Sequence, residues 1–225
     1  MSSEQVCYFF ADAYSSLSES LQLQHRLQSC DTEFHLVVRE SLLADAAGDL
    51  QGTHPRCQLH AVPTGCTNLL SQLLYLQDNL DSRRTVLMCG ARVFKRPQDL
   101  QAFLMATSSH QAVVLATTEA CHSSHGIRCG ALGVIEELTD GSEPEFYLTD
   151  GMLLLSDGRL ALAPAMQSLR RGRAAVAGGE LMSLVNDAVL LGIDVRACDR
   201  LGRLIPARSA TIPFKPDRVQ VCKTG

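Results

Sequence analysis

The sequence predicts a single α/β domain over residues 1–225: a three-layer α/β/α arrangement with a central mixed, largely parallel sheet. An antiparallel meander is expected in the C-terminal half. Two observations lead to this fold class. Up to residue 117, near-continuous apolar runs alternate with segments whose leucines recur at helical spacing, a pattern typical of buried parallel strands joined by helices. After residue 125, short apolar runs are separated by Asp-Gly pairs, which favour tight turns.

The N-terminal half predicts five strands and four helices. Buried strands are predicted by the apolar runs at residues 5–10, 33–39, 58–62, 85–89 and 111–117. Helices are predicted at residues 18–27, 42–49, 67–79 and 98–106. Thr67 is the expected N-cap of its helix, because a hydroxyl can accept a hydrogen bond from a first-turn N–H group. Pro97 suits the first turn of the last of these helices.

The C-terminal half predicts the meander, one further helix and one further strand. Short strands are expected at residues 131–138, 146–148 and 152–155, separated by turns at Asp140-Gly141, Asp150-Gly151 and Asp157-Gly158. Residues 180–191 have the apolar spacing of a helix, with Gly192 as its C-cap. Residues 193–198 predict the next strand, and the prolines from Pro206 onward indicate an extended, irregular tail.

Composition excludes several classes of function. The net charge of −4, the absence of Trp and an aromatic content of 5% disfavour a nucleic-acid-binding surface. The start of the sequence has no basic, then apolar, export signal, and no window is apolar enough to span a membrane. Nine cysteines without a repeated spacing indicate reduced thiols. We therefore expect a cytoplasmic protein without disulfides.

The densest group of metal-ligand residue types is Cys121, His122, His125 and Cys129. Thiolates and imidazoles are the ligands that zinc prefers, and on a helix Cys121, His125 and Cys129 would share one face. The segment follows a predicted strand, contains Gly126 and has no pair of cysteines with two residues between them. We therefore expect a polar loop without bound metal, and the sequence assigns neither a cofactor nor a catalytic residue.

Three further groups have chemistry that could bind an anion or act as an acid or base. Residues 62–68 link a strand to a helix, where free backbone N–H groups can hold an anion, but they lack the phosphate-loop lysine. Basic side chains follow at Arg92, Lys95 and Arg96 and at Arg170, Arg171 and Arg173. Carboxylates lie at Glu143, Glu145, Asp150 and Asp157. We expect all of these to be turn or surface residues.

The C-terminal two-thirds resembles PhnH, a subunit of the bacterial carbon–phosphorus lyase system. The resemblance rests on the helix from Thr67 followed by TVLMC, on LATTEACHSS from Leu115, on GSEPEFYLTDGMLLL from Gly141, and on LLGIDVRAC with the following RLIPARSAT. It implies a non-catalytic or co-catalytic subunit of a phosphonate-degrading assembly, with other protein subunits as partners and a possible homodimer. It implies no cofactor and gives no catalytic residues.

Two other interpretations remain open. One is a nucleotide-diphospho-sugar transferase of the GT-A type with degenerate motifs, because strand–helix alternation followed by a meander suits that fold. Against it, a metal-binding Asp is missing after the TVLMC strand, where the chain reads Cys89-Gly90-Ala91-Arg92. The other is a DsrE-like sulfur-relay protein that uses Cys198.

Overall fold

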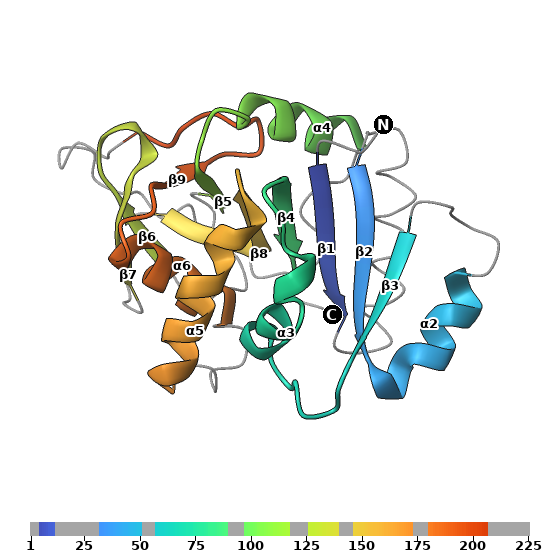
Figure 1. The fold of residues 1–225 in the computed structure, drawn as a ribbon. Coiled ribbons are helices and arrows are strands. Elements are labelled where there is room, and N and C mark those ends of the chain that lie inside the picture. Colours follow the sequence, from blue (N-terminus) through green and yellow to red (C-terminus); the bar gives the residue numbers. More distant parts are fainter. Residues whose placement is uncertain are drawn as a thin grey trace, which may run out of the picture.

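A computed structural model describes residues 5–11, 32–50, 57–89, 97–117, 126–139, 146–172 and 180–206 (Figure 1). Its strands are β1 (Gln5–Ala11), β2 (Thr32–Arg39), β3 (Cys57–Val62), β4 (Arg84–Met88), β5 (Ala112–Thr117), β6 (Gly126–Cys129), β7 (Ile135–Thr139), β8 (Phe146–Leu155) and β9 (Val195–Cys198). Its α-helices are α2 (Leu43–Leu50), α3 (Leu69–Tyr75), α4 (Pro97–Ala106), α5 (Leu162–Arg170) and α6 (Glu180–Leu190). Single 3₁₀ turns are η1 (Glu40–Leu42), η2 (Gln77–Asn79), η3 (Ala131–Gly133) and η4 (Gly158–Ala161).

The described strands form one mixed sheet in the order β3-β2-β1-β4-β8-β5-β9, with β6 paired to β8 and β7 paired to β6. The pairs β1–β2, β2–β3, β1–β4 and β5–β9 are parallel. The strands predicted at residues 5–10, 33–39, 58–62, 85–89, 111–117 and 193–198 correspond to β1, β2, β3, β4, β5 and β9, which all lie in this sheet. The predicted mixed, largely parallel sheet is therefore confirmed.

Helices cover both faces of the sheet, because the parallel strands are apolar on both sides. On one face, Leu70 and Leu73 of α3 and Val185 of α6 pack with Tyr8 and Leu87 of the strands. On the other face, α4 and α2 supply the buried helix residues, with Phe103 and Ala46 fully buried. In Figure 1, α3 and α5 lie across one face of the sheet. The three-layer prediction is therefore confirmed.

The meander prediction is only partly correct. Strands β6 and β7 form an antiparallel pair, but residues 146–155 are one continuous strand, β8, and not two strands separated by a turn. β8 runs antiparallel between β4 and β5 in the middle of the sheet. The Asp150-Gly151 turn is absent because these residues lie in an irregular stretch of β8, where the register against β5 shifts. An unpaired stretch of this kind accommodates the same residue types as a turn.

Several element boundaries differ from the prediction. The N-cap of α3 is Asn68 and not Thr67, and Asn68 forms a capping box with Ser71. Residues 162–170 form α5, which the sequence analysis does not assign. Gly192 ends α6 with φ +80°, as predicted, and Ile193 N donates to Ala188 O across it. The helix predicted at residues 18–27 lies outside the described residues.

Within the described ranges, no helix is both long and apolar enough to cross a membrane. The cysteines at positions 7, 57, 66, 89, 129 and 198 form no disulfide with one another.

Candidate functional site

The topology places one edge of the sheet where α/β proteins bind their ligands. From β1 the chain proceeds outward to β2 and β3, and then crosses back to pair β4 with the opposite side of β1. Ligands of open α/β sheets bind beyond the carboxyl ends of the strands at such a reversal. The described residues at this point are Ala11 at the end of β1, and Met88 and the exposed Cys89 at the end of β4.

Next to this edge, protein groups occupy the turn between β3 and α3 at residues 62–68, which the sequence predicts to be a structural turn. Cys66 N donates to Pro63 O, and Ser71 N donates to the side chain of Asn68. The backbone N–H of Leu69 donates to the carboxylate of Glu180 from α6. A carboxylate of the protein therefore already holds a first-turn N–H group of α3, and the turn offers little to a phosphate.

Strand β8 brings a carboxylate-bearing residue to the same edge. Met152 pairs with Met88, the last residue of β4, so Asp150 lies two positions beyond the carboxyl end of β4. On its other side, β8 pairs Leu153 with Val114 and Leu148 with Ala116. Three more residues separate the partners on β8 than on β5, and Asp150 belongs to this bulge. Bulges of this kind are over-represented next to active sites.

The candidate metal ligands between Cys121 and Cys129, which the sequence predicts to be a polar loop, do not have the helical arrangement that would bring them together. Cys121, His122 and His125 lie outside the described residues, whereas Cys129 is buried at the end of strand β6. Because residues 126–129 are extended, the helical face shared by Cys121, His125 and Cys129 does not form. In the described part of the chain, no three His, Cys, Asp or Glu side chains are placed to hold a metal ion.

Of the other candidates in the described residues, Arg171 and Asp157 have local partners. Arg171 pairs with the buried Asp187 of α6 at 2.6 Å. Asp157 caps η4 and pairs with Arg159, which keeps the predicted turn role for Asp157. Arg170 is exposed at the end of α5. The candidates outside the described residues are Arg92, Lys95, Arg96, Glu143, Glu145 and Arg173.

The thiol of Cys198 is poorly suited to sulfur relay. Cys198 is fully buried in β9, and burial raises the pKa of its thiol to about 12, with the charge of Asp199 adding to the effect. The reactive form of cysteine is the thiolate. At neutral pH this thiol stays protonated and out of contact with solvent.

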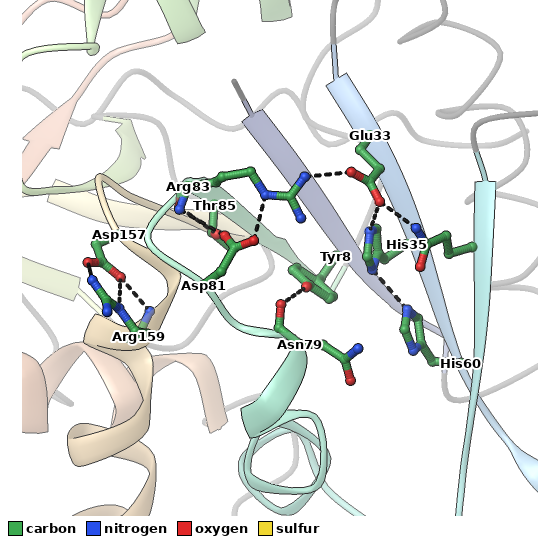
Figure 2. A network of polar contacts seen from close by, with 11 residues as sticks. Tyr8, Glu33, His35, His60, Asn79, Asp81, Arg83, Thr85, Asp157 and Arg159 are labelled. Carbon is green, nitrogen blue, oxygen red and sulfur yellow. Dashed lines mark hydrogen bonds and ion pairs between the residues drawn. The ribbon is translucent and has the colours of Figure 1, made fainter. Parts of the chain in front are cut away.

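The most extensive polar group on the α3 face of the sheet is one that the sequence analysis misses (Figure 2). Glu33 accepts hydrogen bonds from Arg83 at 2.5 Å and from Gln58 at 2.5 Å, and it lies 2.9 Å from Nε2 of His35. Nδ1 of His35 lies 2.8 Å from Nε2 of His60 on the edge strand β3. Asp81 holds the other side of the Arg83 guanidinium at 2.7 Å.

Together, burial and nearby charges lower the pKa of Glu33 and of both histidines and raise the pKa of Tyr8. Burial alone would raise the pKa of Glu33, but hydrogen bonds from Arg83 and His35 lower it below its ordinary value. Burial lowers the pKa of both His35 and His60 below 6.5. Burial and the charge of Asp81 raise the pKa of Tyr8 to about 12, and its hydroxyl donates to Asn79 O. At neutral pH, Glu33 is therefore an anion beside two neutral imidazoles.

A sequence signal for this group exists. Glu33 and His35, and likewise Gln58 and His60, are two residues apart on strands, so each pair shares a face. The register pairs His35 with Gln58 and Val37 with His60, which places the four polar side chains together. Polar residues at alternate positions in otherwise apolar strands indicate such a group in the sequence.

Comparisons with known proteins bear on the fold. No protein-family model matches the chain, and no curated protein matches it. Among solved structures, the chain is similar to 4-diphosphocytidyl-2C-methyl-D-erythritol synthase from Anaerococcus prevotii, at 13% identity over 86% of each chain with a TM-score of 0.57. It is also similar to the inositol-1-phosphate CTP transferase from T. maritima, at 13% identity over 89% of this chain and 86% of that one with a TM-score of 0.59. A third such structure is a glucose-1-phosphate thymidylyltransferase from Bacillus anthracis, at 13% identity over 87% and 86% of the two chains with a TM-score of 0.59.

These similarities overturn the resemblance to PhnH and the phosphonate-degrading role inferred from it. The segments that carried that resemblance have general structural roles: a helix before a strand at α3–β4, a central strand at β8, and a helix before a strand at α6–β9. Such segments recur in many α/β folds, so their order does not identify a family. Over 86 to 89% of the chain, the arrangement is that of the nucleotidyltransferase fold, which favours the GT-A-like alternative.

Proposed function

We propose that this protein binds a pyrimidine nucleotide at the carboxyl edge of β1 and β4. The observation that carries the proposal is the chain reversal between these two strands, in a fold shared with enzymes whose names specify cytidylyl or thymidylyl transfer. Binding at a strand reversal follows from the geometry of open sheets.

The proposal is limited to nucleotide binding, because the described residues that end β1 and β4 supply no ligands for a divalent metal ion. Metal-assisted transfer of a nucleotidyl group needs carboxylate oxygens near the phosphates. The described residues that end β1 and β4, Ala11, Met88 and Cys89, offer none, and the following Gly90-Ala91-Arg92 adds none. Among the described residues that end these two strands, none supplies a carboxylate oxygen for a divalent cation; in the sequence, the carboxylate residue nearest to them is Asp12, directly after β1.

Calorimetric titration of the full chain with CTP, dTTP and UTP, and with ATP and GTP for comparison, tests the proposal. We expect a Kd within about 1 μM to 1 mM for a pyrimidine nucleotide, the range in which enzymes hold their substrates. Cys89→Trp, which fills the edge, is expected to weaken binding at least about tenfold. The matched control is Met105→Trp, at an exposed position of α4. The C-terminal turn of α4 contacts Arg84 at the amino end of β4, so this control is expected to bind normally. Binding of no nucleotide, or equal loss in both variants, would refute the proposal.

A second candidate function, nucleotidyl transfer itself, is favoured by the position of Asp150. Its place in the β8 bulge, beyond the end of β4, brings one carboxylate-bearing residue to the edge. Release of pyrophosphate from CTP or dTTP, with phosphorylated alcohols and sugars as acceptors, measures this activity. If the chain transfers, Asp150→Asn is expected to lower kcat by about a hundredfold. An Asp150→Asn variant with full activity would exclude the role of this residue.

A further inference from the structure

The hydrogen bonds of Glu33, His35 and His60 fix which nitrogen carries each proton. Glu33 is anionic and can only accept, so Nε2 of His35 carries a hydrogen and donates to Glu33 Oε1 at 2.9 Å. A neutral His35 therefore has a bare Nδ1. That atom accepts from Nε2 of His60 at 2.8 Å. In the neutral pair, each ring is protonated at Nε2 and bare at Nδ1.

One added proton leaves this arrangement intact. The proton enters at Nδ1 of His60, which has no hydrogen-bond partner among the described residues, and His60 goes on donating from Nε2. Burial lowers the pKa of His60, and the fixed charges nearby partly offset this, because Glu33 and Asp81 carry two negative charges and Arg83 carries one positive charge. The first proton therefore neutralises the group.

A second added proton breaks the hydrogen bond between His35 and His60. Nδ1 of His35 is the remaining site, and protonating it sets an N–H group against the N–H group of His60 across 2.8 Å. Two donors cannot share a hydrogen bond, and two cations at this separation repel. His35 is only 3% exposed, so water cannot replace the lost partner without a movement of β3.

We propose that His35 and His60 form a proton-controlled latch that holds the edge strand β3 on β2, closed with up to one added proton and opened by the second. β3 is the last strand at its end of the sheet, so β2 is its one strand partner among the described elements. Opening frees the strand that leads into the turn at residues 63–68. The titratable groups facing the latch from the elements around it are Tyr8 of β1, Glu33 of β2, and Asp81 and Arg83 before β4, with the neutral Gln58 beside His60 (Figure 2).

The sign of the pH dependence follows from the direction of the shifts. Burial places the pKa of both imidazoles below their ordinary value of 6.5, so an opened or unfolded chain binds protons more tightly than the closed latch. The latch therefore holds β3 fully above pH 6.5 and loses its hold as the pH falls through the lower pKa values of the closed state.

Amide hydrogen exchange of β3 between pH 8 and pH 5, corrected for intrinsic rates, tests the latch in the full chain. In the pH range where the closed latch holds one added proton and opening takes up the second, the protection of residues 57–62 is expected to fall by about tenfold per pH unit, while β1 stays protected. His60→Gln keeps an N–H donor for His35 but cannot be protonated, so its β3 is expected to stay protected at pH 5. His110→Gln, which changes a histidine outside the group, serves as the matched control and is expected to behave as wild type.

Two results would overturn the proposal. One is an equal acid loss of β3 protection in wild type and His60→Gln. The other is nitrogen NMR of the wild-type imidazoles at pH 8 that places the hydrogen of either ring on Nδ1. The NMR measurement decides the question even if His60→Gln fails to fold.

Discussion

Removing Arg171 tests the energetics of the contact between α5 and α6. Asp187 of α6 is completely buried, and its carboxylate is held by the Arg171 guanidinium at 2.6 Å and by the Ser168 hydroxyl. Arg171→Met leaves this carboxylate buried with a hydroxyl as its remaining side-chain partner. Breaking a buried ion pair in this way costs about 3 to 5 kcal/mol. Because the Arg171 side chain is 39% exposed and solvent screens the pair, we expect the lower end, about 3 kcal/mol.

A double variant shows whether the lost stability comes from the unpaired charge of Asp187. In the double variant Arg171→Met/Asp187→Leu the uncompensated charge is gone, and apolar replacement of a buried pair is often neutral. The double variant is therefore expected to be more stable than Arg171→Met alone. Arg170→Met, which changes an exposed arginine beside it, is expected to change the free energy of unfolding by less than about 0.5 kcal/mol.

Urea unfolding followed by circular dichroism measures all four chains, and a loss of about 3 kcal/mol corresponds to a fall in Tm of about 6 to 12 °C in a domain of this size. Our reasoning would be wrong if Arg171→Met cost no more than Arg170→Met, or if the double variant were the least stable of the set.

Three more predictions concern single positions. Gly202→Ala is expected to lower stability by about 1 to 3 kcal/mol in urea unfolding, because φ is +73° there and an added Cβ would lie 2.5 Å from Cβ of Ala106; an unchanged midpoint would contradict this. Leu73→Ala, at a fully buried position of α3, should cost about 2 to 5 kcal/mol, whereas Tyr75→Ala at an exposed position of the same helix should cost far less. Iodoacetamide at pH 8, with the modified residues mapped by mass spectrometry, should label the exposed Cys89 long before Cys198, whose thiol has its pKa raised to about 12 by burial; early labelling of Cys198 would show that β9 is accessible.

The sequence was sufficient for the sheet because its strands are apolar on both faces. The runs around Phe9, Leu36 and Val113 predict buried strands without knowledge of their partners. The order of the strands could not be predicted. No local sequence feature indicates that residues 146–155 insert between β4 and β5 instead of forming a separate meander. Asp-Gly predicts a turn at Asp150, and only the partner strand shows that the pair lies in a bulge.

The candidate site was harder to predict than the fold. His35 and His60 are 25 residues apart and meet through the register of β2 on β3, which one sequence does not specify. The residues from Cys121 to Cys129 were candidates because they are close in sequence. Cys129 lies on a strand, however, so the helical spacing that would group these residues does not apply. Proximity along the chain was a poor guide to proximity in space.

The insertion of β8 between β4 and β5 has a consequence for how the chain folds during synthesis. β1, β2, β3 and β4 can pair as soon as residue 88 has emerged, but β4 and β5 cannot join until residues 146–155 arrive to bridge them. Until then, one edge of β4 is an open template for pairing with another chain. A ribosome-stalled chain that ends before residue 146 should therefore aggregate or recruit chaperones. Extending it until residue 155 has left the exit tunnel should abolish this behaviour.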